Sequence, residues 1–487
     1  MNEQSIAALR ARVAGDFVVP GDADWDEARR AWNLAVDQRP AAVAFPESVR
    51  DVVEIVTFAR KHALRVAPQG TGHNAAALAI DGGILLKTER MRGISVDAAA
   101  HTARAEAGVM WTEVTHAAAP HGLAALAGSS PGVGVVGYSI GGGISWLSRR
   151  FGLAANSVTA VELVTADGRF VRADTEHEAD LFWAVRGGGG SFGIVTALEF
   201  SLYPVSEVYA GILFFPLERG GQVVNAWREW VDSVPDEVTS LARFLQFPSV
   251  PEIPQPLRGR SFAVVEATFV MDWFAASSLL RPLRELKPVM DTFRTMPVSE
   301  LEHLHMDPKQ PVPGHGDGML LRELDAEAVD AMVTIAGANA RSPLLSVEVR
   351  HLGGALAVPR PGNGALASID AKFALFAAGA TPTPESQTAV ALHVAAVKDA
   401  FAPWDAGRAY LNFAQNGPSG ESVWGADAHA RLQRVKAEWD PGDMLRADVP
   451  VAPHAGAADS RDARPTAAPQ RTFANRSTAA MSSSTFA

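Results

Sequence analysis

Residues 128–143 read GSSPGVGVVGYSIGGG, and this stretch of the sequence decides the fold. Seven of its sixteen positions are glycine. A glycine inside a helix costs about 1 kcal/mol relative to alanine, so the interior of a helix is not expected here. Glycine instead lets the backbone approach a ligand closely. We therefore predict a loop that lies against a bound molecule.

Two further glycine-rich segments lie on either side of this stretch. Residues 68–74 read PQGTGHN, and residues 187–193 read GGGGSFG. Backbone N–H groups in such loops can bind a pyrophosphate without the help of lysine. A single ligand that contacts all three segments must be long and anionic, as a dinucleotide is.

The central stretch also contains two shorter motifs that suggest other chemistry. Gly132–Gly137 matches the nicotinamide-dinucleotide pattern G-x-G-x-x-G, but it lacks the preceding strand and the following helix that this pattern requires. Gly137–Gly141 matches G-x-S-x-G, in which Ser139 would be the nucleophile of a hydrolase. The three glycines after Ile140 disfavour the helix of that motif too, so a serine hydrolase stays only as an alternative.

The charge and the cysteine content exclude several functions. The 487 residues include 43 Lys and Arg and 54 Asp and Glu, which gives a formal net charge of −11. A protein that binds nucleic-acid phosphates needs a basic surface, so no nucleic-acid partner is expected. The chain contains no cysteine, which excludes disulfides, thiolate metal sites and any cofactor linked through sulfur.

No metal site and no membrane association are expected. His303, His305 and Asp307 are candidate metal ligands, but the proline-rich sequence at 306–318 indicates a loop rather than a strand that would align them. No run of about 18 apolar residues predicts a transmembrane helix. The first residues lack the apolar core of a secretory signal. The predicted compartment is the cytoplasm.

Hydrophobic periodicity predicts mixed helices and strands along the chain. The predicted helices are 48–62, 111–121, 180–186 and 427–439, the last with Asp427 as its N-cap. The predicted strands are 64–67, 83–87, 194–202, 211–217, 262–270, 344–351, 372–376 and 409–413, together with a hairpin at 158–173.

Taken together, the glycine segments resemble a known family. PQGTGHN, GSSPGVGVVGYSIGGG, the FGL at 151–153 and DLFWAVRGGGGSFGIVT at 180–196 are similar to the berberine bridge enzyme-like oxidases, FAD proteins of the vanillyl-alcohol oxidase superfamily. The YLNF at 410–413 and RLQRVKAEWDPGDMLR at 431–446 resemble the closing motifs of that family. The segments occur in the order and at the spacing of the family.

The resemblance implies an α+β fold with two parts. One is a PCMH-type FAD-binding domain of two α/β subdomains, made from residues 1–205 and 405–453. The other is a substrate domain at 206–404, an antiparallel sheet covered by helices. The tail at 454–487 is rich in Ala, Ser, Arg and Pro and is predicted to be disordered.

The resemblance also implies how FAD is held. His73 stands where the family bonds the 8α-methyl group of the flavin covalently. Ser130 stands where many relatives carry a second, cysteinyl tether, so FAD is expected to be mono-covalent through His73. Val133 occupies a place associated with oxygen access, which favours an oxidase over a dehydrogenase. The remaining predicted cofactor-binding residues are Pro68, Gln69, Gly70, Thr71, Gly72, Asn74, Ser129, Gly134, Val135, Tyr138, Gly141, Gly142, Gly193, Val195 and Asn412.

Catalytic residues are expected around the flavin ring. Tyr410 belongs to the Tyr-x-Asn motif of the family and is predicted to be a base or a substrate anchor, with Asn412 on the same face of its strand. Tyr138 is predicted at the pyrimidine edge of the flavin. The position of the glutamate base of the family, at 355–358, has no carboxylate.

Three residues of the substrate domain are weaker candidates. Glu348 and Arg350 share one face of a predicted strand and either enter the pocket or form a solvated surface salt bridge. His351 points to the other face of that strand.

The implied reaction is an oxidation. A small organic alcohol, sugar or amine gives a hydride to flavin N5, and O₂ is reduced to H₂O₂. A dehydrogenase with another electron acceptor, a non-catalytic FAD-binding protein and the hydrolase with Ser139 stay open. The oligomeric state is not readable from the sequence.

Overall fold

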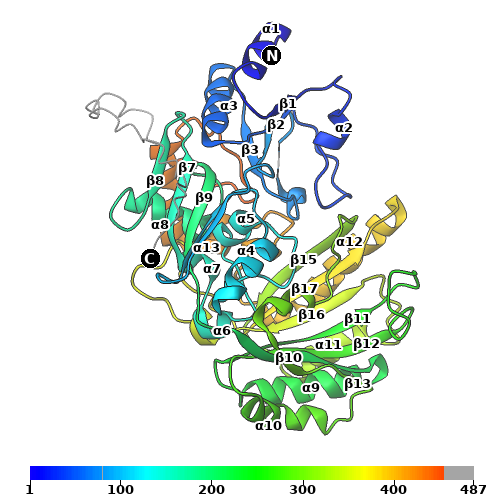
Figure 1. The fold of residues 1–487 in the computed structure, drawn as a ribbon. Coiled ribbons are helices and arrows are strands. Elements are labelled where there is room, and N and C mark those ends of the chain that lie inside the picture. The colour runs from blue at the N-terminus through cyan, green and yellow to red at the C-terminus, as the bar shows by residue number, and fades with distance from the viewer. Residues whose placement is uncertain (79, 455–487) are drawn as a thin grey trace, which may run out of the picture.

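Three β-sheets form the framework of the computed structural model, which describes residues 1–78 and 80–454 (Figure 1). Two sheets lie in the upper half of Figure 1 and the third in the lower half. The domain boundaries at residues 205 and 404 stay predictions. The tail predicted to be disordered lies, apart from His454, outside the described residues.

The first sheet has the strand order β1-β2-β4-β3. Its elements and their neighbours are α1 (Glu3–Arg10), β1 (Asp16–Val18), α2 (Trp25–Ala28), β2 (Ala42–Phe45), α3 (Val49–Lys61), β3 (Val66–Gln69), the short 3₁₀ helix η1 (Ala75–Ala77) and β4 (Ile84–Lys87). Strands β2, β4 and β3 are parallel, and α3 provides the crossover between β2 and β3. Ser48 begins α3 by accepting a hydrogen bond from the Asp51 N–H.

The second sheet is antiparallel, with the order β5-β6-β9-β7-β8. Its strands are β5 (Ile94–Asp97), β6 (Thr102–Glu106), β7 (Val158–Val164), β8 (Phe170–Ala173) and β9 (Ile194–Ser201). Its helices are α4 (Trp111–Ala118), η2 (Ala119–His121), α5 (Val135–Ile140), α6 (Ser148–Phe151), α7 (Ala154–Ser157) and α8 (Ala179–Gly188). The predicted hairpin is β7 and β8, with Gly168 at φ +86° in its turn.

The prediction of a continuous loop at 128–143 is wrong in its centre, because α5 occupies Val135–Ile140. The glycines lie mainly outside this helix. Gly134 precedes its first turn and Gly141 follows its last one, so only Gly137 carries the helix-interior cost.

The third sheet has the order β13-β10-β12-β11-β16-β17-β15, and β14 also pairs with β10. Its strands are β10 (Glu207–Pro216), β11 (Val238–Gln246), β12 (Ser261–Phe269), β13 (Met290–Asp291), β14 (Arg294–Pro297), β15 (Gly314–Leu321), β16 (Ser346–His351) and β17 (Phe373–Ala380). Its helices are η3 (Leu217–Arg219), α9 (Gly220–Val231), α10 (Trp273–Arg284), η4 (Val298–His303), α11 (Ala326–Ala336), η5 (Gly354–Leu356), α12 (Pro384–Phe401) and η6 (Ala402–Trp404). The loop expected at 306–318 is therefore shorter than predicted: it ends at Pro313, and β15 begins at Gly314.

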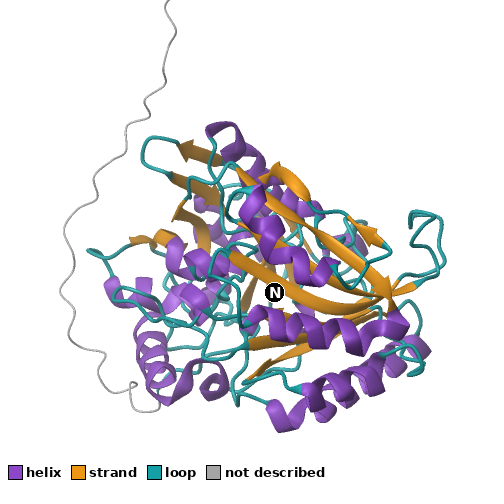
Figure 2. Ribbon diagram, turned by 90° about the horizontal axis from the view of Figure 1, so that it is seen from below, coloured by secondary structure: helices purple, strands orange, loops and turns teal. Residues whose placement is uncertain are grey.

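The third sheet is buried on both faces. Leu213 and Phe215 of β10 pack in the core formed with α9–α12, whereas Ile212 and Phe214 pack in a core that includes Trp146 from the N-terminal half. Figure 2 shows helices along one side of this broad sheet. Burial on both faces explains why its strands are continuous apolar runs, and it leaves one face turned towards the FAD-binding part.

The C-terminal segment returns to the first two sheets. It contains η7 (Leu411–Phe413) and α13 (Gly420–Trp439), which bends at Gly425. The strand predicted at 409–413 is wrong, because these residues pair with no strand and form a 3₁₀ turn. The predicted start of the helix at Asp427 is also wrong. Ser419 is the N-cap, and Gly425 at φ +76° interrupts the periodicity on which the prediction depended.

A buried ion pair holds this segment in place. Lys436 Nζ, with its side chain fully buried, lies 2.6 Å from Asp440 Oδ2 and donates to the backbone oxygens of Ser191 and Leu445 at 2.9 and 3.2 Å. These bonds join α13 to the third glycine-rich segment and to the residues that follow α13.

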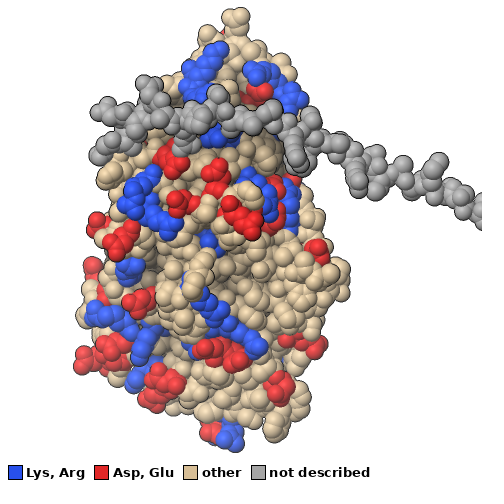
Figure 3. Space-filling model, turned by 90° about the vertical axis from the view of Figure 1, so that its left-hand side faces the viewer, with Lys and Arg blue, Asp and Glu red and all other residues tan. Residues whose placement is uncertain are grey.

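Acidic and basic side chains are interspersed on the face of the molecule seen in Figure 3. Among the helices of residues 1–78 and 80–454, none is both long and apolar enough to cross a membrane.

Candidate active site

The first glycine-rich segment begins at the end of β3 and presents His73. Gly72 has φ +85°, and a Cβ there would lie 2.9 Å from the Ala31 side chain, so glycine is required. Thr71 Oγ1 lies 2.6 Å from His73 Nδ1, and Trp32 stacks on the imidazole with ring centroids 4.1 Å apart. Sequence reasoning missed Trp32, because nothing in the N-terminal segment indicates that it reaches a loop some forty residues later.

His73 is a neutral imidazole with one nitrogen available. Burial lowers its pKa to about 4, so the ring carries no proton charge near pH 7. Its Nε2 atom is buried and, among the described residues, has no hydrogen-bond partner. Both side-chain polar atoms of Gln69 are in the same situation. Burial of a polar atom without a hydrogen-bond partner costs free energy, so these atoms indicate that this site binds a ligand.

The second segment is joined to the start of α4. The N–H of Trp111 donates to Val133 O, and the N–H of Val135 donates to Val109 O, both at 3.0 Å. The glycines of this segment border open space, since a Cβ on Gly132 or Gly137 would meet no atom within 4 Å. Gly141 instead lies close to Asn412, whose Oδ1 would be 1.8 Å from an added Cβ.

The third segment has both open and closely packed glycines. A Cβ on Gly189 would meet nothing within 4 Å, and one on Gly190 would make only ordinary contacts, the nearest with Ala447 at 3.7 Å. Gly193 lies against β7, where a Cβ would come within 2.2 Å of Leu163 Cδ1, and Val195 is paired with Leu163 in the sheet. Packing in the second sheet therefore explains why Gly193 is glycine.

Asp448 is a residue at this site that sequence reasoning missed. Asn74 Nδ2 donates to Asp448 Oδ2 at 2.8 Å, which connects the first segment to the C-terminal block. Burial raises the pKa of Asp448 to about 6, and the bond from Asn74 opposes this shift. In the sequence, only its position in the closing motif LRADVP pointed to Asp448. Its partner Asn74 lies 374 residues earlier in the chain, so the contact could not be predicted.

Tyr410 and Asn412 meet the second segment at its C-terminal end. Tyr410 Oη accepts hydrogen bonds from the Ile144 N–H at 3.0 Å and from Asn412 Nδ2 at 3.2 Å. Asn412 Nδ2 also lies 3.0 Å from the backbone oxygen of Tyr138. The side chains of Tyr410 and Asn412 do lie next to each other. A 3₁₀ turn, and not a strand, brings them together.

Burial decides the protonation state of the two tyrosines. It raises the pKa of Tyr410 despite the two hydrogen bonds, and it raises the pKa of Tyr138 well above its ordinary value of 10.0. Both side chains are therefore neutral phenols near pH 7. Tyr138 Oη is buried without a partner in the described part of the chain.

The Ser139 alternative is wrong. Ser139 lies inside α5 with 2% of its surface exposed, whereas a nucleophile elbow needs a strand-to-helix turn that presents the hydroxyl.

Glu348 and Arg350 lie on the face of the third sheet that is turned towards the FAD-binding part. Glu348 is 2% exposed, and Arg350 Nε donates to its Oε1 at 2.7 Å. The solvated surface pair is thus wrong, because the neighbouring domain covers this face. His351 lies elsewhere, with Nε2 at 3.0 Å from Arg149 Nη1, and burial lowers its pKa to about 3.

The three candidate metal ligands are not arranged as a site. His303 ends η4 and contacts Glu302, whereas His305 is buried between Glu266 and Glu348. Asp307 Oδ1 is 3.9 Å from His305 Nε2. Within the described ranges, no group of three or more His, Asp or Glu is placed to hold a metal ion.

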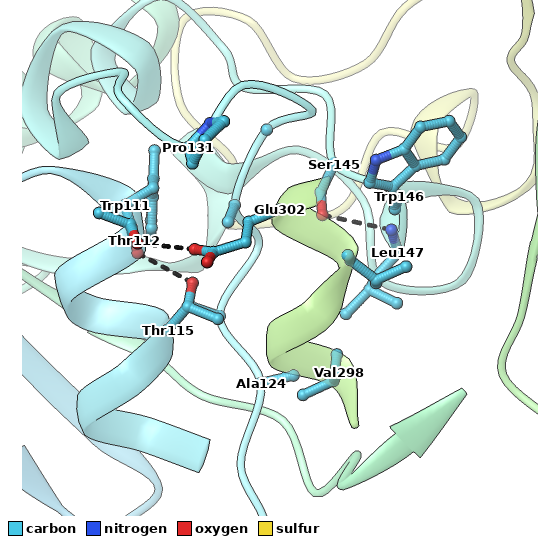
Figure 4. A pocket seen from close by; sticks show the side chains of 14 residues that line it. Trp111, Thr112, Thr115, Ala124, Pro131, Ser145, Trp146, Leu147, Val298 and Glu302 are labelled. Carbon is cyan, nitrogen blue, oxygen red and sulfur yellow. Dashed lines mark hydrogen bonds between the residues drawn. The ribbon is translucent and has the colours of Figure 1, made fainter. Parts of the chain in front are cut away.

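A small cavity of about 20 Å³ lies behind the second segment (Figure 4). Trp111 and Trp146 line it, and neither indole N–H has a partner within residues 1–78 and 80–454. Glu302 also lines it and accepts a hydrogen bond from Thr112 Oγ1 at 2.6 Å. The volume is sufficient for one water molecule.

The residues around the three segments fit FAD. Open space borders Gly132, Gly137 and Gly189, as a bound dinucleotide requires. Gln69, His73 and Tyr138 add buried polar atoms that have no partner among the described residues and can therefore bind polar groups of the cofactor.

Two family models match separate parts of the chain. The family model described as "FAD binding domain" matches residues 40–174, and the model described as "Berberine and berberine like" matches residues 409–451. These two matches support the predicted berberine bridge enzyme-like family of FAD-binding proteins. The predicted family and the predicted α+β, PCMH-type fold are confirmed.

Two known oxidases are similar to parts of this chain. (R)-6-hydroxynicotine oxidase from Paenarthrobacter nicotinovorans is 35% identical over 203 residues, which are 41% of this chain and 44% of that protein. Glucooligosaccharide oxidase from Sarocladium strictum is 33% identical over 208 residues, 42% of each chain. The chain thus spans about half the length of the curated relatives it matches.

The fold extends over more of the chain than these alignments do. The solved structure of Physcomitrella patens BBE-like 1 has a TM-score of 0.80 at 21% identity, and the match covers 92% of this chain and 98% of that chain.

Proposed function

We propose that this chain is an FAD-linked oxidase of a small organic alcohol, sugar or amine, with its flavin bound covalently through His73. The observation that carries the proposal is the buried, neutral imidazole of His73, whose Nε2 has no partner among the described residues. The relatives named above as oxidases support the reaction type.

The three glycine-rich segments would hold the cofactor. Residues 68–74, 128–142 and 189–195 would bind it through backbone N–H groups, with Gln69 and Tyr138 as polar side chains. Oxidation of the substrate carbon by hydride removal, followed by reduction of O₂ to H₂O₂, is the chemistry that FAD supplies when bound. The chain contains no cysteine, so His73 would be the single covalent attachment.

Tyr410 would anchor the substrate. Its oxygen already accepts two hydrogen bonds, and its pKa is raised, so its own proton is left to donate to a substrate oxygen or nitrogen. Of the two roles predicted from the sequence, the anchor therefore fits better than the base. Asn412 would position Tyr410 through the 3.2 Å hydrogen bond.

Val133, which lies in the second segment, favours an oxidase over a dehydrogenase. The absence of cysteine fits the reducing cytoplasm as the compartment. Measurement of H₂O₂ against reduction of a dye, under air and under argon, separates the two activities. Dye reduction without H₂O₂ under air would identify a dehydrogenase.

The test of the cofactor is the colour of acid-precipitated protein. Wild type should give a yellow pellet, since a covalent flavin stays with the chain. His73→Ala should release the colour into the supernatant, whereas His121→Ala, an exposed control, should keep it in the pellet. A colourless wild-type protein would contradict FAD binding, and a yellow His73→Ala pellet would contradict the attachment site.

A further inference from the structure

A cluster of charged side chains lies on the flavin-facing side of the third sheet, away from solvent. Arg243 of β11 stands opposite Glu348 of β16 in the register of the two strands. Residues 241 and 264 on the neighbouring strands β11 and β12 pack in the core shared with the N-terminal half, so Arg243 and Glu266 share that face. The cluster therefore faces the space between the two parts of the molecule.

The inner members of the cluster form ion pairs with one another. Arg243 Nε is 2.6 Å from Glu266 Oε1, and His305 Nδ1 is 2.8 Å from Glu266 Oε2. His305 Nε2 is 3.1 Å from Glu348 Oε2. All four side chains are at most 5% exposed. Such a cluster is expensive to bury, and it contributes geometric definition more than stability.

The outer member is Arg350, and only some of its N–H groups form hydrogen bonds. Its Nε donates to Glu348 Oε1 at 2.7 Å, and its Nη2 lies 3.3 Å from both Ser129 Oγ and His305 Nε2. Its guanidinium lies 5.1 Å from the centre of the Phe413 ring. Among the described residues, its Nη1 makes no hydrogen bond. Ser129 belongs to the second glycine-rich segment and Phe413 to the Tyr410 turn. The free donors thus lie where the substrate sheet meets the proposed flavin site.

We propose that Arg350 binds a carboxylate of the substrate, so that the substrate is an alcohol or amine that also carries a carboxylate group. This inference rests on the proposed function, because it deepens the specificity of the same site. A guanidinium held at Nε by one carboxylate keeps N–H groups free for a second one, and Arg–carboxylate bonds are among the stronger hydrogen bonds in proteins.

The balance of charge in the cluster favours the binding of an anion. Burial and Arg243 lower the pKa of His305, but Glu266, Asp307 and Glu348 together raise it to about 9. Three cations therefore face two buried carboxylates. The third carboxylate is Asp307, which is 30% exposed and 3.9 Å from His305. A bound carboxylate would compete with Asp307 for the same positive charge.

The test compares two probes of the same shape, benzoate and benzamide, in the purified holoprotein. Binding is followed by the change in flavin absorbance and, independently, by calorimetry. Wild type should bind benzoate at least tenfold more tightly than benzamide. Asp307→Asn should increase this preference, because it removes the competing charge.

Variants of Arg350 complete the test. Arg350→Met should abolish the preference for benzoate. Because it removes one of the two partners of Glu348 and leaves only His305, the double variant Glu348→Gln/Arg350→Met should also be made, with the exposed Arg281→Met as control. Equal binding of the two probes by wild type, or a preference that survives in a folded Arg350 variant, would overturn the proposal.

The two proposals fail in different ways. A colourless protein that still prefers benzoate by calorimetry would contradict the flavin proposal and support the anchor. A yellow protein that does not discriminate between the probes would contradict the anchor alone.

Discussion

Replacement of Asp448 by asparagine should stabilise the protein at high pH and leave it unchanged at low pH. Asp448 lies in the C-terminal block, and its carboxyl accepts a side-chain hydrogen bond from Asn74 of the first glycine-rich segment at 2.8 Å. An asparagine oxygen can accept the same bond, so the substitution removes only the ionisation.

The size of the effect follows from the pKa. Burial raises the pKa of Asp448 from 3.8 to about 6, so the folded protein binds this proton more tightly than the unfolded chain does. The stability that this proton supplies is complete below pH 3.8 and is lost as the pH rises through 6. Relative to the variant, wild type should therefore be less stable by about 0.5 kcal/mol at pH 4, about 1.6 at pH 5 and about 3 at pH 8. Because Asp448 is only partly buried, solvent makes these the upper values.

Thermal unfolding of the two proteins across pH 4–8 measures this difference. The variant should unfold about 5 °C higher than wild type at pH 8, and the gap should close towards pH 4. A gap of constant size would refute the reasoning, because a packing effect does not depend on pH. A variant that is less stable at pH 8 would show that the ionised carboxylate has a partner that supports it.

Two further substitutions test other parts of the site. Tyr410→Phe removes the proposed anchor and should lower kcat/KM by about tenfold for the substrate that gives most H₂O₂ in a panel, with the flavin retained; an unchanged kcat/KM would exclude Tyr410 from substrate binding. Lys436→Met leaves Asp440 buried without its cation and should cost about 3–5 kcal/mol of stability, whereas Arg281→Met, which breaks an exposed pair, should cost under 1 kcal/mol. Thermal unfolding distinguishes the two, and equal midpoints would refute the role given to the buried pair.

Much of the fold was readable because its signals are local. The capping residue Ser48, the hairpin glycine Gly168 and the apolar runs of the third sheet each act on their immediate neighbours, and the corresponding elements are present. The errors have local causes too. Gly425 interrupted the helical pattern of α13, and the many glycines of 128–143 concealed the six-residue helix between them.

The pairings between distant segments were not readable. Trp32 stacks on His73, Asp448 accepts a bond from Asn74, and Arg350 reaches Ser129 across 221 residues. No periodicity or motif encodes these contacts, because they arise when separate elements pack together.

The sequence by itself determined the family, the positions of the three glycine-rich segments and, through its lack of cysteine, that His73 is the single candidate for a covalent tether. These follow from residue type and local spacing. Only the tertiary structure decided the charge state of the site. His73 is buried and neutral, and Tyr410 is protonated because burial raises its pKa. Glu348 and Arg350 belong to an enclosed cluster and are not a pair on the surface. The physical reason is desolvation, since the cost of a charge depends on what covers it, and the covering groups come from remote parts of the chain.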